Sequence, residues 1–344
     1  MTIASKCVIA GAGTGKTTYL LELALKAPRN DNVLYLTYTN AAAVHFRDVI
    51  KAIYGGVPQN ITVMTWFSFL LIHGVRPFPY PLPGFRAHGI KFVEGRVPPK
   101  RGVTRGKPEY YLANKQNDLY SSRLADLACR CDEQVKGEVV KRISDIFQLI
   151  LVDEAQDLSS YDYDFVSKLM KTSSSVVLVG DPRQRTYTTS QEGVYQKQTI
   201  FEYLTEQELC EIDSASLTVC YRCKSDVVDL SNELFPDLPA LLANSDETNV
   251  HIAILQRQDA ENQSDDFKNA MHLCWKDGSI PINVNRSMTM GSAKGSEFDD
   301  VVVWLTKPMT KWFDDRQAEL KPEARSKLYV AITRARNNLW LVKA

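Results

Sequence analysis

The stretch Ala10-Gly11-Ala12-Gly13-Thr14-Gly15-Lys16-Thr17 decides the fold that we expect for this chain of 344 residues. It follows an apolar run and opens a helical pattern, which is the strand–loop–helix context of a phosphate-binding loop. Glycines let backbone N–H groups curl around phosphates, and the helix N-terminus adds positive potential. Lys16 can then reach the β- and γ-phosphates, and the Thr17 hydroxyl can hold Mg²⁺. A glycine-rich turn without a ligand is the weaker alternative, because the loop ends in Gly-Lys-Thr.

Two later strand ends carry polar residues that suit the same chemistry. The apolar run 149–152 ends in Asp153 and Glu154. Asp153 suits coordination of Mg²⁺, and Glu154 suits a general base that orients or deprotonates the attacking water. The run 176–179 ends in a turn with Gln184, a candidate sensor of the γ-phosphate. Acids at a strand end can also be solvated loop residues, but the upstream phosphate loop favours the catalytic interpretation.

Around these segments, short β-branched runs alternate with helical patterns. This alternation predicts an α/β protein with mostly parallel sheets covered by helices. The 44% hydrophobic content indicates a packed soluble protein. The 41 basic residues balance 41 acidic ones, which excludes a uniformly basic surface but leaves room for a local basic groove.

The sequence also predicts where the protein works. No run of about 18 apolar residues predicts a transmembrane helix, and we expect no signal peptide ahead of the phosphate loop. Seven irregularly spaced cysteines predict reduced thiols in a cytoplasmic protein. The pairs Cys129/Cys131 and Cys220/Cys223 leave a zinc site as a minor alternative, since no histidine lies near them in the sequence.

One stretch breaks the α/β pattern. Residues 74–108 hold seven of the 15 prolines and six of the 17 glycines, too many for a core strand or helix. Residues 86–107 carry seven Lys or Arg against one acid, with aromatic residues interleaved. We expect an irregular surface insertion, and two interpretations have equal weight. It is either a solvated loop or a surface that contacts phosphates and stacks bases of a single strand, through Arg96, Lys100, Arg101 and Arg105.

The order of these segments resembles that of the superfamily 1 helicases of the UvrD/Rep/PcrA type, from Val8 to Val342. The phosphate loop resembles motif I, LVDEAQD (151–157) motif II and VGDPRQRTY (179–187) motif III. The remaining matches are LTYTNAAA (36–43) with motif Ia, TVMTWFSF (62–69) with Ib, LTVCYR (217–222) with IV, MTMGSAKGSEFDDVVV (288–303) with V and LYVAITRARNNLWLV (328–342) with VI. Eight matches in one order point to common family rather than chance.

This resemblance implies two RecA-like P-loop NTPase domains that bind ATP and Mg²⁺ in the cleft between them. It predicts a first domain from 1–75 and 135–205, an inserted subdomain from 76–134, and a second domain from 206–344. Tyr221 would stack on adenine, and Glu297 would bind ribose. Arg222 and Arg334 align with two arginine fingers that stabilise charge on the γ-phosphate. The implied catalytic set is Lys16, Asp153, Glu154, Gln184, Arg222 and Arg334; the nucleotide set is Gly11, Ala12, Gly13, Thr14, Gly15, Lys16, Thr17, Thr18, Tyr221 and Glu297; Thr17 and Asp153 would hold Mg²⁺.

The resemblance also implies a track for single-stranded nucleic acid, with DNA favoured. Its residues would be Tyr38, Asn40, Thr65, Trp66, Phe67, Tyr187 and Lys294, together with the basic residues of the insertion. By composition alone, Tyr38 and Phe67 could equally be core aromatics.

Several positions depart from the family pattern. Thr18 stands where an arginine usually lies near the base, and Gly291 replaces the motif V histidine. Thr189 and Ser190 replace an aromatic–arginine pair. Only residues 223–287 separate motifs IV and V, so the large accessory domain is missing.

These departures leave three functions open. The first is a compact ATP-dependent translocase or helicase on single strands. The second is a nucleotide-gated ATPase subunit that works with a partner nuclease in DNA repair or phage defence. The third is a compact RNA helicase.

Overall fold

The computed structural model describes residues 3–78, 86–93, 95–99, 101–114, 117–186, 190, 193–195, 198–244 and 252–344. The chain divides into two compact units. Unit 1 comprises Met1–Ile9, Lys16–Gly180 and Tyr187–Asp213, and unit 2 comprises Ala10–Gly15, Asp181–Thr186 and Ser214–Ala344. The two short segments 10–15 and 181–186 therefore group with the second unit, although they continue strands of the first.

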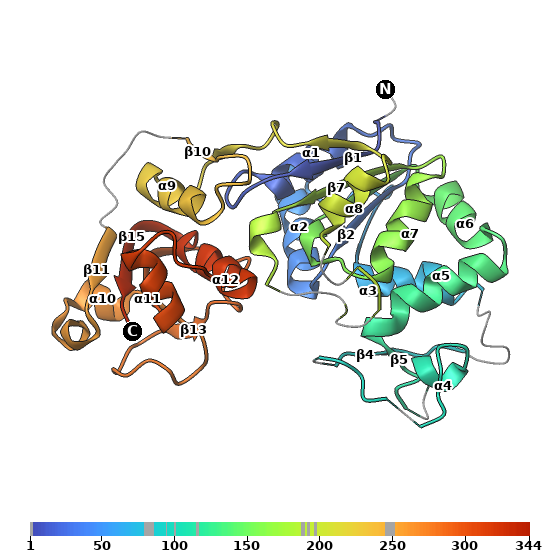
Figure 1. The fold of residues 1–344 in the computed structure, drawn as a ribbon. Helices are drawn as coiled ribbons and strands as arrows, with labels where there is room; N and C mark the ends of the chain where they lie inside the picture. Colours follow the sequence, from blue (N-terminus) through green and yellow to red (C-terminus); the bar gives the residue numbers. More distant parts are fainter. Residues whose placement is uncertain are drawn as a thin grey trace. The chain divides into compact units, whose positions relative to one another are not determined.

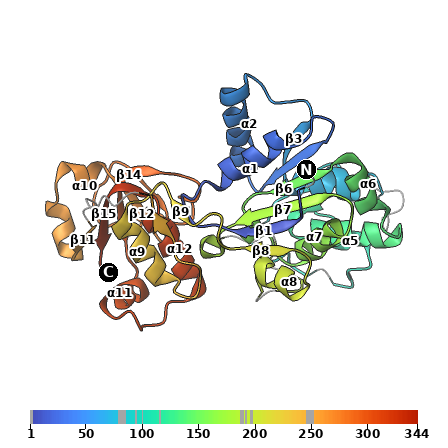
Figure 2. The ribbon, with the colours of Figure 1, turned by 90° about the horizontal axis from the view of Figure 1, so that it is seen from above.

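Unit 1 is built on a six-stranded parallel sheet with the order β3-β2-β6-β7-β1-β8. Every residue of the inner strands β2 and β6 is buried, as expected for a parallel sheet covered on both faces. Figure 2 shows β6, β7, β1 and β8 side by side. The last strand extends the sheet beyond residue 205, where the sequence had placed the end of the first domain. The strands are β1 (Lys6–Ile9), β2 (Val33–Thr37), β3 (Ile61–Thr65), β6 (Leu149–Val152), β7 (Ser175–Gly180) and β8 (Glu211–Asp213).

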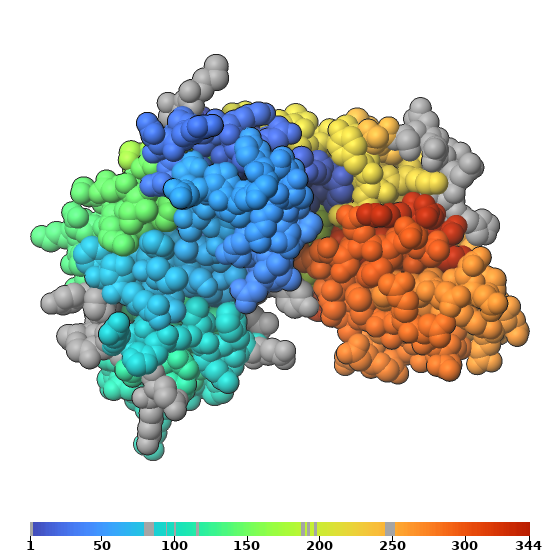
Figure 3. All heavy atoms as spheres, turned by 180° about the vertical axis from the view of Figure 1, so that it is seen from behind, coloured from blue at the N-terminus to red at the C-terminus, as the bar shows by residue number. Residues whose placement is uncertain are grey.

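Helices cover this sheet with their apolar faces. In α2 (Asn40–Tyr54), Ala43, Phe46 and Ile50 are buried, and Gly55 ends the helix in the left-handed conformation. The outer surface of α2 is visible in blue in Figure 3. The other helical segments are α1 (Lys16–Lys26), α3 (Trp66–Phe69), the π-helix η1 (Leu70–Val75), η2 (Ser121–Arg123), α5 (Leu124–Gln134), α6 (Glu138–Ile146), η3 (Ala155–Asp157), α7 (Tyr161–Met170) and α8 (Ile200–Glu206).

The inserted segment forms only short elements where the structure describes it. They are β4 (Ile90–Lys91), α4 (Pro108–Tyr111) and β5 (Leu119–Tyr120), and the two strands pair in parallel. Figure 1 shows them gathered at one end of unit 1, beyond α5. The irregular backbone is as expected from the density of proline and glycine.

Unit 2 contains a five-stranded parallel sheet with the order β11-β15-β14-β12-β13 and a separate pair β10-β9. Its core joins strand residues such as Val301 and Leu339 to Leu328 and Tyr329 of α12. The strands are β9 (Val219–Cys220), β10 (Leu242–Ala243), β11 (Ile252–Leu255), β12 (Met271–Cys274), β13 (Ser287–Thr289), β14 (Phe298–Trp304) and β15 (Ala335–Val342). The helical segments are η4 (Pro182–Gln184), α9 (Ser225–Leu234), η5 (Arg257–Asn262), α10 (Asp265–Asn269), α11 (Lys307–Asp314) and α12 (Pro322–Ile332).

These sheets confirm the predicted α/β class of RecA-like parallel architecture. Within the described ranges, no helix has both the length and the apolar character needed to cross a bilayer. The same residues contain no group of three or more metal-ligating side chains of the His, Cys, Asp or Glu type, which gives the zinc alternative no support.

Candidate functional site

The predicted site residues of unit 1 follow the carboxyl ends of parallel strands. Tyr38 follows β2, Thr65 ends β3, and Asp153 follows β6. The carboxyl edge of an open parallel sheet is where ligands bind in α/β proteins. The phosphate loop itself starts directly after β1, whose last residue is Ile9.

Lys16 and Thr17 begin α1 and meet the acidic pair within unit 1. The Thr17 hydroxyl lies 3.5 Å from Asp153 Oδ2, at the limit of a hydrogen bond. Asp153 is held from two further sides: its Oδ2 accepts a 2.6 Å hydrogen bond from the Tyr35 hydroxyl, and its Oδ1 accepts one of 2.8 Å from the Glu154 amide. Tyr35 lies outside the motifs that predicted the site, and it reaches the Asp153 carboxylate from the neighbouring strand β2.

The electrostatics of Asp153 favour a nearby cation. Burial and the charge of Glu154 raise its pKa to about 6, against the opposing effects of the Tyr35 hydrogen bond and the Lys16 charge. The carboxylate is therefore less stable than an exposed one, and a cation beside it would lower its free energy. Oxygen donors from Thr17 and Asp153 are the type that Mg²⁺ prefers.

Glu154 occupies a constrained backbone position. Its φ of 54° lies in the left-handed region, where non-glycine residues are uncommon and cluster at functional sites. Its carboxylate accepts a hydrogen bond from the Gln156 amide. Gly180 leaves room for that amide, because a Cβ at Gly180 would lie 2.6 Å from Gln156 Oε1.

The phosphate-loop residues of unit 2 form a constrained turn. Gly13 has φ of 72°, and a Cβ there would lie 2.6 Å from Arg222 Cβ, so glycine is required on both counts. The Thr14 hydroxyl donates to Gly11 O at 3.0 Å. The Ala12 amide donates to the Tyr329 hydroxyl at 3.0 Å, a contact that the sequence did not suggest although Tyr329 lies in motif VI.

Gln184 belongs to a buried polar cluster around Asp181. Its side-chain amide donates to Asp181 Oδ2 at 2.9 Å, and Arg183 lies 3.3 Å from Asp181 Oδ1. All three side chains are buried, and Asp181 also caps η4 through the Arg183 amide. The cluster around Asp181 therefore fixes the orientation of Gln184. The sequence predicted a role for Gln184 in the site, but it did not single out Asp181 or Arg183.

Glu297 joins two arginines of unit 2. Its Oε1 lies 2.6 Å from Arg222 Nη2, and its Oε2 pairs with Arg336. Partial burial alone would raise the Glu297 pKa, but the hydrogen bonds and charges of the two arginines lower it overall. The predicted ribose ligand thus holds the predicted finger Arg222, while Tyr221 beside it is 67% exposed and available for stacking.

Arg334, the second predicted finger, is buried. Its Nε donates to Val330 O and its Nη1 to Ser296 O, both at 3.0 Å, and its Nη2 donates to the Thr333 hydroxyl at 3.2 Å. These bonds fix the guanidinium to the end of α12 and to the loop before β14. Arg336 instead lies on the exposed side of β15.

The two cysteines that flank Tyr221 and Arg222 interact with each other. The Cys223 amide donates to Cys220 Sγ at 3.4 Å, and both thiols are buried. A hydrogen bond from the Cys223 thiol, together with backbone hydrogen bonds from Cys223 and Arg222 and the Arg222 charge, lowers the pKa of Cys220 to about 6 despite burial. Burial raises the pKa of Cys7, Cys129, Cys131, Cys210 and Cys274 instead.

The predicted strand contacts of motifs Ia and Ib differ in exposure. The predicted strand contact of Trp66 does not fit the structure. Trp66 is only 2% exposed, and its indole N–H donates to Asp162 at 2.7 Å within the core. Phe67 is also buried, but it contacts Tyr38 on one side and Phe92 on the other, with ring centroids 5.5 and 5.2 Å apart. Phe92 is 63% exposed, so the insertion supplies the open face of this aromatic row.

For the remaining residues that were predicted to contact the strand, the structure gives only their exposure or a helix-capping contact. Asn40 is exposed at the start of α2, whose N-cap is the preceding residue. Thr65 accepts from the Ser68 amide at 3.2 Å and so caps α3. Lys294 is half-buried, Thr18 is exposed on α1, and Tyr187 lies outside the described residues.

The basic residues of the insertion do not act alike. Arg105 donates from Nε to both oxygens of Asp126, at 2.8 and 2.9 Å, and stacks 4.4 Å from the ring of Tyr161. Its guanidinium is thus committed to protein contacts, which argues against the expected phosphate contact. Arg96 and Arg101 are exposed, and Lys100 lies outside the described residues.

Comparisons with known proteins identify the family. A family profile described as "AAA domain" matches residues 2–190, and one described as "Viral superfamily 1 RNA helicase core domain" matches residues 105–343. A "Probable DNA helicase" of Mycoplasma pneumoniae is 25% identical over 427 residues, covering 97% of this chain and 80% of the relative. This alignment is longer than the chain itself, so the relative carries segments that have no counterpart here.

Solved helicases resemble the chain more distantly. Arterivirus nonstructural protein 10, described as a helicase, has been solved with DNA and in a second crystal structure. Each matches with a TM-score of 0.49 and 15% identity over 98% of this chain. The chain spans about 60% of the length of that protein in the complex with DNA. Taken together, the motifs, the parallel sheets and the matching profiles show that the chain belongs to the superfamily 1 helicases and is an ATP-hydrolysing nucleic-acid helicase.

Proposed function

We propose that this helicase is a compact, Mg²⁺-dependent motor that translocates along single-stranded DNA. The observation that carries the proposal is the meeting of Lys16 and Thr17 with the buried Asp153 and the half-buried Glu154 at the carboxyl edge of the first sheet. This arrangement provides both phosphate binding and a base for water, which an ATP-driven cycle needs.

The roles of the residues follow from their positions. Lys16 contacts the β- and γ-phosphates, and Glu154 accepts a proton from the attacking water or orients it. Gln184 is positioned by Asp181 and reports on the γ-phosphate. Arg222 and Arg334 stabilise the charge that accumulates on the γ-phosphate oxygens.

The donor set fits a magnesium ion. Thr17 and Asp153 offer a hydroxyl and a carboxylate that is destabilised by burial, and Tyr35 keeps that carboxylate oriented. When bound, Mg²⁺ neutralises negative charge on the β- and γ-phosphate oxygens.

Strand binding is assigned to Tyr38 and the exposed Phe92, both of which contact the buried Phe67, with Arg96 and Arg101 following Phe92 in the insertion. Stacking on aromatic faces contributes about 1–3 kcal/mol per base without reading sequence. Lys100, Tyr187, Asn40, Thr65 and Lys294 remain candidates on the strength of the family resemblance.

The choice of nucleic acid has support on both sides. The relative that covers 97% of the chain is described as a probable DNA helicase. The profile over residues 105–343 is that of viral RNA helicases, which favours RNA as the second candidate. We favour DNA because the relative matches both units of the chain.

The test is ATP hydrolysis measured with single-stranded DNA, with RNA of the same sequence, and without nucleic acid. Stimulation by DNA above RNA is the expected result. Stimulation by RNA alone would replace DNA by RNA in the proposal. Turnover that no nucleic acid changes would refute the motor, and would favour a nucleotide-gated subunit.

A further inference from the structure

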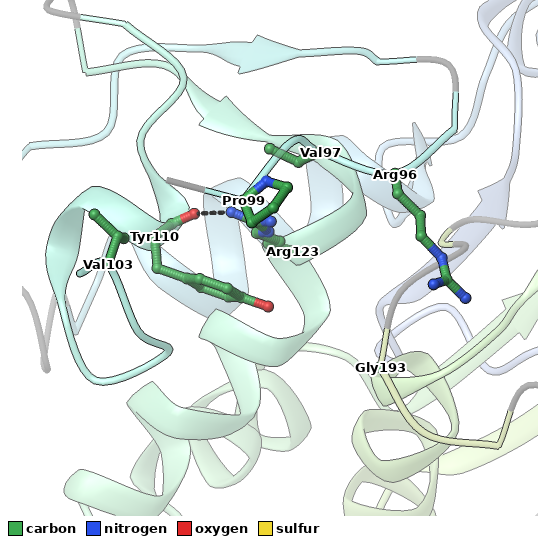
Figure 4. Close-up of a pocket in the computed structure, with 7 residues that line it drawn as sticks. All are labelled: Arg96, Val97, Pro99, Val103, Tyr110, Arg123 and Gly193. Carbon is green, nitrogen blue, oxygen red and sulfur yellow. Dashed lines mark hydrogen bonds between the residues drawn. The ribbon is translucent and has the colours of Figure 1, made fainter. Parts of the chain in front are cut away.

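A cavity of about 370 Å³ lies in unit 1 and is lined mainly by residues of the insertion. Three parts of the chain build it: residues within 96–99 and 103–110 of the insertion, Arg123 at the end of η2, and Gly193 from the segment after the Gln184 turn. Its volume falls within the range of about 300–1,000 Å³ that small-molecule sites occupy. Figure 4 shows the lining residues arranged around it.

The lining combines positive charge with apolar walls. The described lining residues are Arg96, Val97, Pro99, Val103, Tyr110, Arg123 and Gly193, of which two are cationic and none is acidic. Guanidinium groups are the preferred partners of phosphate oxygens because their N–H donors match the geometry of the anion. Valine and proline side chains offer the apolar contact that a base or sugar needs.

One wall of the cavity is fixed in advance. Arg123 is 8% exposed, its guanidinium stacks 3.8 Å from the Tyr110 ring, and its Nη1 donates to Tyr110 O at 2.5 Å. The Tyr110 side chain is thereby held, and its hydroxyl points along the cavity toward the side where Arg96 lies (Figure 4). A ligand therefore meets an ordered aromatic and cationic wall rather than a flexible one, which lowers the entropy cost of binding.

The opposite wall depends on a glycine. Gly193 has φ of 93°, and a Cβ there would lie 2.2 Å from Ser160 Oγ. The backbone at Gly193 thus packs directly against the start of α7. Arg96, an exposed residue, completes this side of the cavity with its guanidinium.

From these observations we infer that the cavity binds one nucleotide, with its phosphate between Arg96 and the Tyr110 hydroxyl and its base or sugar against Val97, Pro99 and Val103. The nucleotide comes either from the bound strand or from free mononucleotide, since both present the same phosphate and base. The strand source rests on the proposed function. None of the residues that line this cavity belongs to the phosphate loop or to the Tyr38–Phe67–Phe92 row.

The first arm of the test measures binding of a labelled oligothymidylate by fluorescence anisotropy without ATP. Arg96→Ala removes the accessible guanidinium, and Val103→Trp fills the cavity while leaving every charge in place. Arg86→Ala is the matched control, because Arg86 is an exposed arginine of the same segment that does not line the cavity. We expect each cavity variant to weaken binding about tenfold, the scale of one lost charge-assisted hydrogen bond, and the control to change it less than about twofold.

The second arm titrates thymidine monophosphate into the Lys16→Ala protein, whose phosphate loop is disabled. Saturable binding that Arg96→Ala or Val103→Trp abolishes, with oligonucleotide affinity unchanged, would assign the cavity to free nucleotide. Equal losses from Arg96→Ala and Arg86→Ala without any effect of Val103→Trp would mean general electrostatic attraction and would overturn the site. No effect in either arm would also overturn it, while DNA-stimulated ATPase activity in the unaltered protein would leave the proposed function standing.

Discussion

Replacing Arg105 by alanine separates a structural arginine from a strand-binding one. Asp126 has a side chain only 3% exposed and receives two hydrogen bonds from Arg105 Nε, a further contact from Arg105 Nη2, and one of 3.1 Å from the Tyr111 hydroxyl. Arg105→Ala leaves this carboxylate with Tyr111 as its remaining partner among those described above. A strand contact would instead leave folding nearly unchanged and weaken only DNA binding.

The magnitude follows from the burial of each partner. Breaking a fully buried ion pair costs about 3–5 kcal/mol, because an uncompensated charge stays in the interior. Arg105 is 47% exposed, so solvent screens the pair and the expected loss in unfolding free energy is about 1.5–3 kcal/mol. For a unit of this size, that loss lowers the melting temperature by roughly 3–12 °C.

The assay is thermal unfolding followed by circular dichroism, with Arg86→Ala as control. The double variant Arg105→Ala/Asp126→Asn tests the cause: once the carboxylate is neutral, removing Arg105 should cost little more. The slope of DNA affinity against salt should stay unchanged. A melting temperature within 1 °C of the control, combined with a slope reduced by about one unit, would refute the structural role and restore the phosphate contact.

Four further predictions concern the nucleotide site and its surroundings. Glu154→Gln should retain nucleotide binding but lower turnover by about 10²–10⁴-fold; normal phosphate release would point to a different base. Tyr35→Phe should raise the Mg²⁺ concentration for half-maximal ATPase activity by about 10–100-fold, whereas Tyr163→Phe, which loses a hydroxyl bonded to Gln198 O, should not. Arg334→Ala should lower turnover by up to about 10³–10⁵-fold while fluorescent ATP still binds, and a loss of only a few fold would assign the arginine a packing role. Cys220 is buried and ionises above its pKa of about 6, so the ultraviolet absorbance of its thiolate should rise between pH 5 and 7. Cys223→Ala should move that rise toward the ordinary value of 9.0, whereas Cys274→Ala should not. An unmoved absorbance profile would exclude the thiol pair as the cause.

Local motifs made the nucleotide site the most accessible part of the chain to prediction, because its candidate residues are neighbours in sequence. The phosphate loop needs glycine at Gly13 because its φ is positive and because a Cβ would meet Arg222, so the glycine pattern itself indicates the turn. Asp153 and Glu154 directly follow a fully buried strand, so the apolar run in the sequence was enough to place them at a strand end. The alternation of apolar runs and helical patterns likewise gave the parallel sheets.

Contacts made across long sequence distances were not predictable in this way. Tyr35 meets Asp153 only because β2 lies beside β6 in the sheet. Trp66 looked like a stacking residue, but an aspartate 96 positions away binds its indole nitrogen. Arg105 looked like any other cation in a basic run, and its partner Asp126 lies on α5. In each case the residue type was informative and the partner was not visible in the pattern.

The place of β1 in the first sheet has a consequence for synthesis of the chain. This strand, close to the start of the sequence, pairs with β7 on one side and β8 on the other. At the usual rate of about 5–20 residues per second, roughly 10–40 s pass between the emergence of β1 and that of β8 from the ribosome. During that interval both edges of an apolar strand wait for partners, and sheets with such distant pairings fold slowly. The strand that leads into the nucleotide site is therefore made well before both of its sheet partners, which makes the nascent chain a natural client for chaperones that cover exposed strands.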